Sequence, residues 1–299
     1  CGSFLLALLT KEYKSTAGSS PMVRFILGAA MMIGALVFLG CPLRMVLRMS
    51  AGDLNAWVAL IGFAGGVATG SFFLKKGFSL GRAYEAKPLS GAVLPVLLAA
   101  LLVVGTATGV YAMSAEGPGS KHAPVILSLV AALIIGALAQ KSRMCFAGSI
   151  RDVLLMKNFD LISIIAALFA VMAVYNLAAG NFHLGFSVQP IAHSQHLWNI
   201  LGMYVVGFAA VLAGGCPLRQ LILAGQGSSD SAVTFLGMLL GAAAAHNFGL
   251  VGAAAKAATE TEAAVPGGPS AAGKIAVIVC IVVLFVIAGT NLRRKKAAR

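Results

Sequence analysis

Long apolar runs separated by short polar segments dominate this chain. Eight of them approach the roughly 20 residues that a helix needs to cross a bilayer, and they lie at about 22–40, 56–74, 91–114, 123–140, 160–180, 196–215, 230–252 and 274–291. Apolarity within each run is nearly continuous, whereas the strands of a membrane barrel alternate apolar and polar residues in short segments. The pattern therefore predicts an all-α polytopic membrane protein with about eight transmembrane helices.

Composition narrows the class of protein further. Of the 299 residues, 59% are hydrophobic and only 10% are charged, with a mean hydropathy of +0.93, which excludes an ordinary soluble domain. The formal net charge of +13 could indicate a nucleic acid partner, but the basic residues cluster at the ends of the apolar runs. Such clusters follow the positive-inside rule, so we expect contact with lipid and none with nucleic acid.

The basic clusters also predict an orientation in the membrane. If the N-terminus is cytoplasmic, most basic residues face the cytoplasm, and eight spans return the C-terminus to the same side. The residues that decide this are Lys75, Lys76, Arg82, Lys87, Lys141, Arg143, Arg151, Lys157 and the run at 293–296. We therefore expect both termini of the chain to be cytoplasmic.

The pentapeptide Gly-Cys-Pro-Leu-Arg occurs twice, at 40–44 and at 215–219, each time at the end of an apolar run. Under the predicted topology, the two copies run in opposite directions through the membrane. Many transporters build a central site from duplicated units whose helices break at matching places. We predict an inverted internal repeat within one membrane domain, with residues 1–114 as the first half and 115–299 as the second.

Each copy of the pentapeptide places a thiol where a short half-helix would begin. Gly40 and Gly215 let the chain break, and the proline after each cysteine favours the first helical position. Cys41 and Cys216 then precede helix N-termini, where unpaired N–H groups and the helix dipole favour anions and thiolates. The alternative is a plain helix break that contains a small buried cysteine.

Arg44 and Arg219 lie on the first turn of these half-helices, where a cation opposes the helix dipole. Either the guanidinium attracts a passing anion, or the side chain reaches the membrane interface as an anchor, and the sequence leaves both open. We include both arginines, with Gly40 and Gly215, among the candidate substrate-binding residues.

A third cysteine ends the fourth apolar run. Cys145 lies among small residues, and a short helix after it would turn its N-terminal end and the thiol toward one cavity. A cytoplasmic loop that merely fixes topology is the alternative. Cys280, in contrast, lies inside a uniform apolar run and is expected only to pack.

Other kinds of site find little support. The five cysteines form no Cys-x-x-Cys motif, which argues against a disulfide-exchange enzyme. His183, His193 and His196 lack neighbouring carboxylates and are expected to be solvated, so we predict no metal site and no cofactor. Acidic residues fall at span ends or in loops, so no carboxylate is placed to relay protons. Asn176 and His246 interrupt apolar runs and are expected to hydrogen-bond between helices.

The two Gly-Cys-Pro-Leu-Arg motifs and the segment Ser-Arg-Met-Cys-Phe-Ala-Gly around Cys145 resemble the YeeE/YedE family of membrane proteins. The resemblance covers nearly the whole chain. Within that family, the stretches at 215–231 and 241–249 are most similar to the YedE branch, which is linked to selenium metabolism.

This resemblance implies transport of a small selenium or sulfur anion, such as selenite or thiosulfate, across the inner membrane of a bacterium. It implies an inverted-repeat helical protein whose first half lacks an N-terminal segment in this chain. It also implies a central path in which the anion contacts the thiols of Cys41, Cys145, Cys216 and Cys1.

Two other classes of function stay open. One is a membrane enzyme, a thiol-dependent sulfur or selenium transferase or oxidoreductase that forms a persulfide on Cys41 or Cys216. The other is a membrane recruiter that binds a small soluble sulfur or selenium carrier protein through its basic cytoplasmic face. The leading expectation is a transporter or channel and not an enzyme, because thiols and cations without a central carboxylate suit an anionic substrate.

Overall fold

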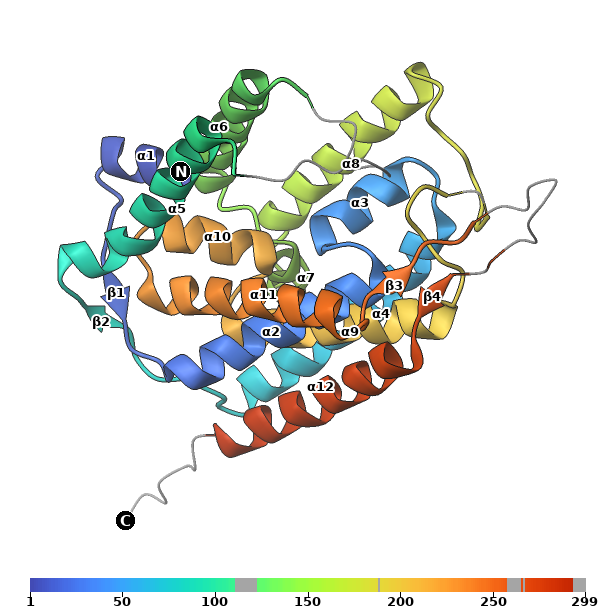
Figure 1. The fold of residues 1–299 in the computed structure, drawn as a ribbon. Coiled ribbons are helices and arrows are strands. Elements are labelled where there is room, and N and C mark those ends of the chain that lie inside the picture. The colour runs from blue at the N-terminus through green and yellow to red at the C-terminus, as the bar shows by residue number, and fades with distance from the viewer. Residues whose placement is uncertain (111–122, 188, 257–264, 266, 293–299) are drawn as a thin grey trace, which may run out of the picture. The chain divides into compact units, whose positions relative to one another are not determined.

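The computed structural model of the protein describes residues 1–110, 123–187, 189–256, 265 and 267–292, and helices dominate them (Figure 1). The helices are α1 Gly2–Leu9, α2 Pro21–Phe38, α3 Pro42–Ser50, α4 Leu54–Lys75, α5 Pro88–Thr108, α6 Val125–Lys141, α7 Phe146–Met156, α8 Asp160–Ala178, α9 His196–Ala213, α10 Pro217–Gly225, α11 Ser229–Asn247 and α12 Ala271–Thr290. Two antiparallel pairs of short strands accompany them, β1 Thr16–Ala17 with β2 Tyr84–Glu85, and β3 Gly252–Ala253 with β4 Gly268–Pro269.

The predicted class of an all-α polytopic membrane protein is confirmed. Within the described residues, seven helical segments are long and apolar enough to cross a membrane. Three of them, Pro21–Ser50, Val125–Met156 and His196–Gly225, each contain a long helix followed by a short one. The predicted run at 230–252 corresponds to α11, which is not among the seven; it has polar residues at both ends, such as Asp230 and His246.

The repeated pentapeptide recurs as repeated local structure. Helices α2 and α9, which precede the two copies, are both 18 residues long. Helices α3 and α10, which follow them, are both 9 residues long and both start at the proline of the motif. We call α2–α3 the first copy and α9–α10 the second copy; their opposite orientation in the membrane stays a prediction.

Some sequence predictions fall outside the residues that the structure describes. The basic run at 293–296 is one of them. The boundary between the predicted halves, at residues 114 and 115, is another, so the division into halves also stays a prediction.

The chain folds into two compact units. The first unit contains Cys1–Gly18, Arg82–Met144 and Leu221–Ala232, which hold α1, α5 and α6. The second contains Ser19–Gly81, Cys145–Gln220 and the chain from Val233 onward. Both copies of the long helix, α2 and α9, belong to this second unit.

In the first unit, α1 packs closely on α6. A Cβ at Gly2 would lie 2.2 Å from the Leu133 carbonyl oxygen, so only glycine permits this approach. Ser3 Oγ donates to the Ile222 carbonyl at 2.9 Å and contacts Gln140 at 3.2 Å. Gln140 in turn donates to a Glu12 carboxylate oxygen at 3.1 Å, which satisfies a buried amide.

In the second unit, α9 is the central helix. It packs against α2, α4 and α12 (Figure 1), and 78% of the apolar window in His196–Gly225 is buried. Glycines let the backbones of α4 and α9 approach each other. A Cβ at Gly66 would lie 2.2 Å from the backbone carbonyl oxygen of Tyr204, and a Cβ at Gly207 would lie 2.3 Å from that of Phe63. Small residues at such contacts are typical of helix packing in membranes, where close backbone approach supplies much of the attraction.

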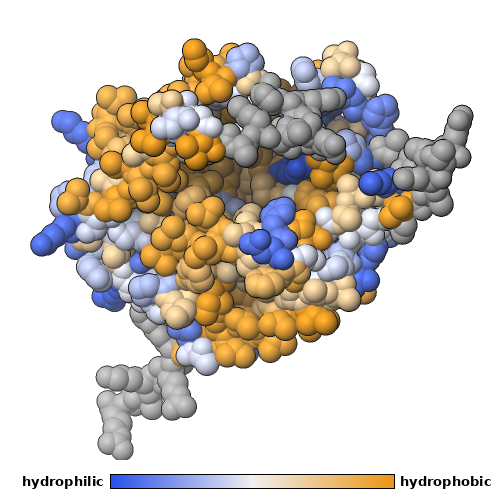
Figure 2. All heavy atoms as spheres, viewed as in Figure 1, coloured by the Kyte–Doolittle hydropathy of each residue, from blue (hydrophilic) through white to orange (hydrophobic). Residues whose placement is uncertain are grey.

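Outer helices of the second unit present apolar side chains outward. Only 6% of the apolar window of α8 is buried. Figure 2 shows apolar side chains gathered over α12, where Ile275, Val282 and Val286 are more than half exposed. Such a surface is stable in lipid and would aggregate in water.

Polar residues within the spans behave in two ways. Asn176 on α8 contacts Ser50 Oγ at the end of α3 at 3.2 Å, so its predicted bond between helices is confirmed. His246, at the end of α11, is exposed. The expectation of an interior position was wrong for this histidine, because α11 ends just beyond it, at Asn247.

Substitution of Gly66 tests the close packing of α4 on α9. We expect Gly66→Ala to destabilise the protein by about 1–3 kcal/mol, since the added methyl overpacks a helix contact, and to lower the unfolding temperature in detergent. Gly65→Ala is the matched control, because its Cβ would meet only a Tyr204 ring carbon at 3.7 Å. Equal unfolding temperatures for the two variants would contradict the packing described here.

Candidate functional site

Four cysteines stand at the start of short helices: Cys1 at α1, and the three at α3, α7 and α10 that the sequence predicted. The carbonyls of Cys41, Cys145 and Cys216 accept the first helical hydrogen bonds of α3, α7 and α10, at 2.9, 2.9 and 3.0 Å. Each cysteine is therefore the residue that caps a helix N-terminus, where backbone N–H groups lack partners within the helix.

Two of these thiols meet. Cys145 and Cys216 are 6% and 0% exposed, neither is in a disulfide, and their side chains lie close enough to interact with each other. We call them the thiol pair. The sequence did not predict this contact.

Backbone N–H groups from both short helices surround the thiol pair. The Gly148 N–H donates to Cys145 Sγ at 3.2 Å, and the Cys216 N–H interacts with the same sulfur. The N–H groups of Arg219 and Phe146 interact with Cys216 Sγ. Each sulfur therefore lies at the positive end of its own helix and against the N–H groups of the other.

Gly148 makes room for Cys145. A Cβ at this position would lie 3.1 Å from Cys145 Sγ, closer than ordinary contacts. The glycine in the sequence Cys-Phe-Ala-Gly thus lets the backbone N–H reach the sulfur without a side chain between them.

The carbonyls left unpaired at the end of α9 find side-chain donors. Gly214, with a φ of +82°, ends the helix in the left-handed region. The Ala213 oxygen accepts from Arg24 Nη1 and from Gln220 Nε2 at 3.0 Å. Gln220, which is fully buried, also donates to the Gly215 oxygen at 3.2 Å.

The end of α2 is held in a similar way. Leu39 takes the left-handed conformation there, with a φ of +66°, which costs a residue with a side chain about 1 kcal/mol or more. Arg48 Nη1 donates to the Phe38 oxygen at 3.2 Å, while its Nε pairs with Asp53 at 2.6 Å. His193 Nε2 contacts the Val37 oxygen at 2.8 Å.

His193 corrects one expectation. It is 1% exposed and bonded to the backbone, so the prediction of a solvated loop histidine was wrong for it. Burial lowers its pKa, and the neutral ring donates from Nε2 to the Val37 carbonyl. Within the described residues, no group of three or more histidine, cysteine or acidic side chains is arranged to hold a metal.

The glycine before each repeated cysteine lies under an arginine. A Cβ at Gly40 would come within 3.1 Å of Arg44 Cδ, and one at Gly215 within 2.8 Å of Arg219 Cγ. Both arginines therefore fold back over the helix break that precedes their own helix. These contacts involve the methylene groups of the side chains, so a role for the guanidinium groups at the break and anchoring at the membrane interface both stay open.

The other cysteines differ from the thiol pair in exposure and capping. Cys41 is partly exposed and makes no side-chain capping bond. Cys1 belongs to the first unit, where it is exposed and lines a cavity of about 540 Å³ with residues of α5 and α6. Cys280 is buried in α12, in agreement with a packing role.

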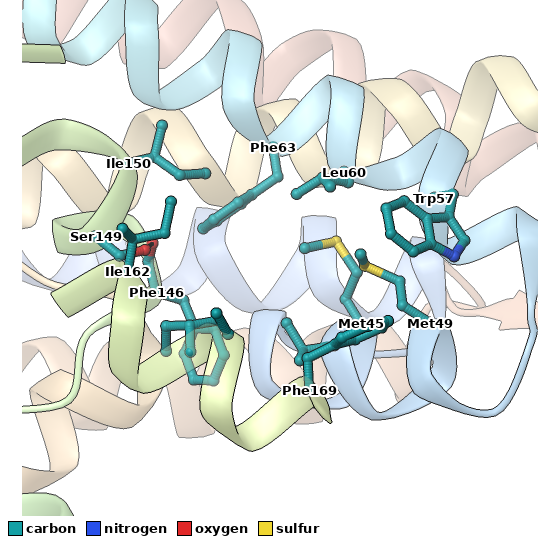
Figure 3. Close-up of a pocket in the computed structure, with 13 residues that line it drawn as sticks. Met45, Met49, Trp57, Leu60, Phe63, Phe146, Ser149, Ile150, Ile162 and Phe169 are labelled. Carbon is teal, nitrogen blue, oxygen red and sulfur yellow. Dashed lines mark hydrogen bonds between the residues drawn. The ribbon is translucent and has the colours of Figure 1, made fainter. Parts of the chain in front are cut away.

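An apolar cavity of about 200 Å³ lies among α3, α4, α7 and α8. In Figure 3, Met45 and Met49 extend from α3 toward Leu60, with Phe169 nearby. Ser149 supplies a hydroxyl to the lining, but it donates to the Phe146 carbonyl at 2.8 Å. The cavity suits an apolar occupant, since its walls offer little to the oxygens of an anion.

Sequence reasoning missed the residues that hold the helix ends, namely Arg24, Arg48, His193 and Gln220. A signal was present, because a buried polar residue beside a helix break in lipid must bind the freed backbone groups. The sequence does not indicate which backbone group each of these side chains binds, because the partners lie far apart in the chain. Arg24, for example, is 189 residues from Ala213, whose carbonyl it binds.

Together, these features define a multi-pass α-helical membrane protein whose helices break at buried cysteines. Comparison with known proteins agrees. The sequence model described as sulphur transport matches residues 141–299, and the chain belongs to this family, the YeeE/YedE family.

Two curated relatives carry the same name. The chain is 26% identical over 103 residues to the thiosulfate transporter TsuA of Escherichia coli strain K12, which covers 34% of the chain and 29% of the relative. It is 30% identical over 115 residues to the thiosulfate transporter TsuA of Spirochaeta thermophila, which covers 37% and 33%. The matches thus span about a third of each relative's length.

Oxidation tests the thiol pair. Copper phenanthroline with air should join Cys145 to Cys216 in a disulfide, because two neighbouring thiols need little movement to bond. Peptide mapping by mass spectrometry without reductant should find this linkage, and neither Cys41 nor Cys280 linked to either residue. Cross-links distributed evenly among the four cysteines would contradict the geometry.

Proposed function

We propose that this protein carries a small sulfur- or selenium-containing anion across a membrane, along a path on which cysteine thiols contact the anion. The observation that supports this most is the thiol pair, where two buried sulfurs face the N-termini of two helices. Membership of the sulphur transport family agrees with it.

The chemistry of the thiol pair suits an anion that has shed its water. An ion in the membrane interior needs donors to replace its hydration, and helix N–H groups supply them without a fixed charge. Thiols add weak S–H donors and polarisable sulfur, which match a soft sulfur or selenium atom. Conduction requires sites that bind well enough to admit an ion and weakly enough to release it, and these neutral donors fit that requirement.

The identity of the anion rests on two kinds of support. The curated relatives are named thiosulfate transporters, and the pattern in 215–231 and 241–249 resembles the selenium-linked branch of the family. Both point to a thiosulfate- or selenite-like species. Its charged oxygens would accept hydrogen bonds from the N–H groups, and its soft sulfur or selenium atom would contact the cysteine sulfurs.

The remaining predicted residues extend the same path. Cys41 caps α3 in the same way as Cys216 caps α10, and Cys1 is the fourth candidate thiol. Arg44 and Arg219 would raise the local concentration of anions beside the two helix breaks. We place the protein in a bacterial inner membrane with the two copies inverted. Both ends of the chain are then cytoplasmic if α11 crosses the membrane as an eighth span beside the seven candidate spans.

Uptake measurements test the proposal. We expect Cys41→Ala, Cys145→Ala and Cys216→Ala in the full protein each to lower the initial rate of labelled thiosulfate or selenite uptake by about tenfold or more, the effect of losing about 1.4 kcal/mol. Uptake into cells or proteoliposomes gives the rate, and the amount of folded protein in the membrane normalises it.

Cys280→Ala is the matched control, since Cys280 is buried in α12 away from any helix break. It should keep nearly normal uptake. Equal tolerance of alanine at all four positions would exclude a thiol-lined path.

The contact between two thiols also favours a second candidate function, sulfur transfer. In this reaction a cysteine thiolate attacks the outer sulfur of thiosulfate, sulfite leaves, and a persulfide remains on the cysteine. Mass spectrometry after exposure to thiosulfate distinguishes the two functions. A stable gain of one sulfur atom on Cys145 or Cys216 would support transfer, and an unmodified protein with intact uptake would support transport.

A further inference from the structure

A second cavity in the same unit has a different character. It measures about 250 Å³ and is lined by two arginines, Arg24 and Arg151, together with the end of α9 and the segment that follows α4. Its volume is several times the ~30 Å³ that one water molecule occupies in the liquid. A tetrahedral oxyanion with bound water therefore fits inside.

Both arginines are held in place by other groups of the protein. Arg24 binds the Ser19 hydroxyl at 2.7 Å through Nε and the Ala213 carbonyl through Nη1. Arg151 pairs with Asp152 at 2.8 Å and its side chain is 29% exposed. Guanidinium groups fixed in this way lose little entropy when a ligand binds.

The cavity adjoins both segments that carry the thiol pair. Gly214 in its wall is two residues before Cys216, and Arg151 lies on α7, the helix that Cys145 caps. The charge of Arg151 is close enough to act on the Cys145 sulfur. An anion that leaves or approaches the thiol pair on this side would therefore meet the guanidinium groups of Arg24 and Arg151, the second of which is paired with Asp152.

We infer that the cavity between Arg24 and Arg151 is a binding site for a small divalent oxyanion, next to the thiol pair. The inference rests on the proposed function and names a second site on the same route. Paired guanidinium groups bind the oxygens of sulfate-like anions through charge-assisted hydrogen bonds. The thiol pair would then contact the soft sulfur or selenium atom of the anion, and the arginines of this cavity would bind its charged oxygens.

Binding to the purified protein in detergent tests the site. We expect isothermal titration at low chloride to detect binding of both sodium sulfate and sodium thiosulfate. Arg151→Gln should weaken both by about tenfold or more, the effect of one charge-assisted hydrogen bond. Arg24→Gln should also weaken binding, but it removes the hydrogen bond to the Ala213 carbonyl as well. Arg151→Gln, at a partly exposed position, is therefore the variant that tests the site.

Lys157→Gln is the matched control. It removes the same charge at the end of the same helix, from an exposed side chain that does not line the cavity, so its affinity should equal that of the unaltered protein. Unchanged affinity in Arg151→Gln, or no binding of either anion to the unaltered protein, would overturn the inference.

Cys216→Ser separates this inference from the proposed function. It should keep sulfate binding and lose uptake. If Cys216→Ser loses uptake while Arg151→Gln binds normally, the anion site is wrong and the thiol path stands. If Arg151→Gln binds weakly while Cys216→Ser transports normally, the anion site stands and the thiol path is wrong.

Discussion

A broken helix in a membrane leaves backbone groups without partners, and that constraint shapes the centre of the second unit. Lipid offers no hydrogen bonds, so every freed carbonyl and N–H group must find a partner within the protein. At the end of α9, the Ala213 carbonyl binds Arg24 and Gln220. At the end of α2, the Phe38 and Val37 carbonyls contact Arg48 and His193.

The backbone N–H groups at the breaks have different partners from the backbone carbonyls. Arginine, glutamine and histidine side chains bind the carbonyls, whereas N–H groups at the start of α7 and α10 contact the sulfurs of Cys145 and Cys216. Sulfur is a weak acceptor, so these N–H groups keep much of their capacity to bind something stronger. The chain belongs to the family of sulphur transport proteins, and N–H groups with this spare capacity would suit the anion that we propose it carries.

The sequence was sufficient for features that depend on local pattern. Apolar runs gave the spans, and Gly-Cys-Pro gave the breaks with a cysteine at the start of a short helix, because turn and cap chemistry act within a few residues. Two features were not predictable from the sequence. One is the contact between Cys145 and Cys216, and the other is the hydrogen bond from Arg24 to the Ala213 carbonyl. Both depend on how helices distant in sequence pack, and one sequence carries no record of that. His193 was misjudged for the same reason: its loop gives no sign that it folds against α2.

Two of the bonds that hold the helix ends link each helix end to a residue outside its own copy. His193, which precedes α9, binds the end of α2, and Arg24, on α2, binds the end of α9. Each break is therefore held partly by its own copy, through Arg48 and Gln220, and partly from outside it. Had the ancestor been a shorter polypeptide, two molecules of it would already have needed each other as a dimer, and gene fusion would have made an existing mutual dependence permanent.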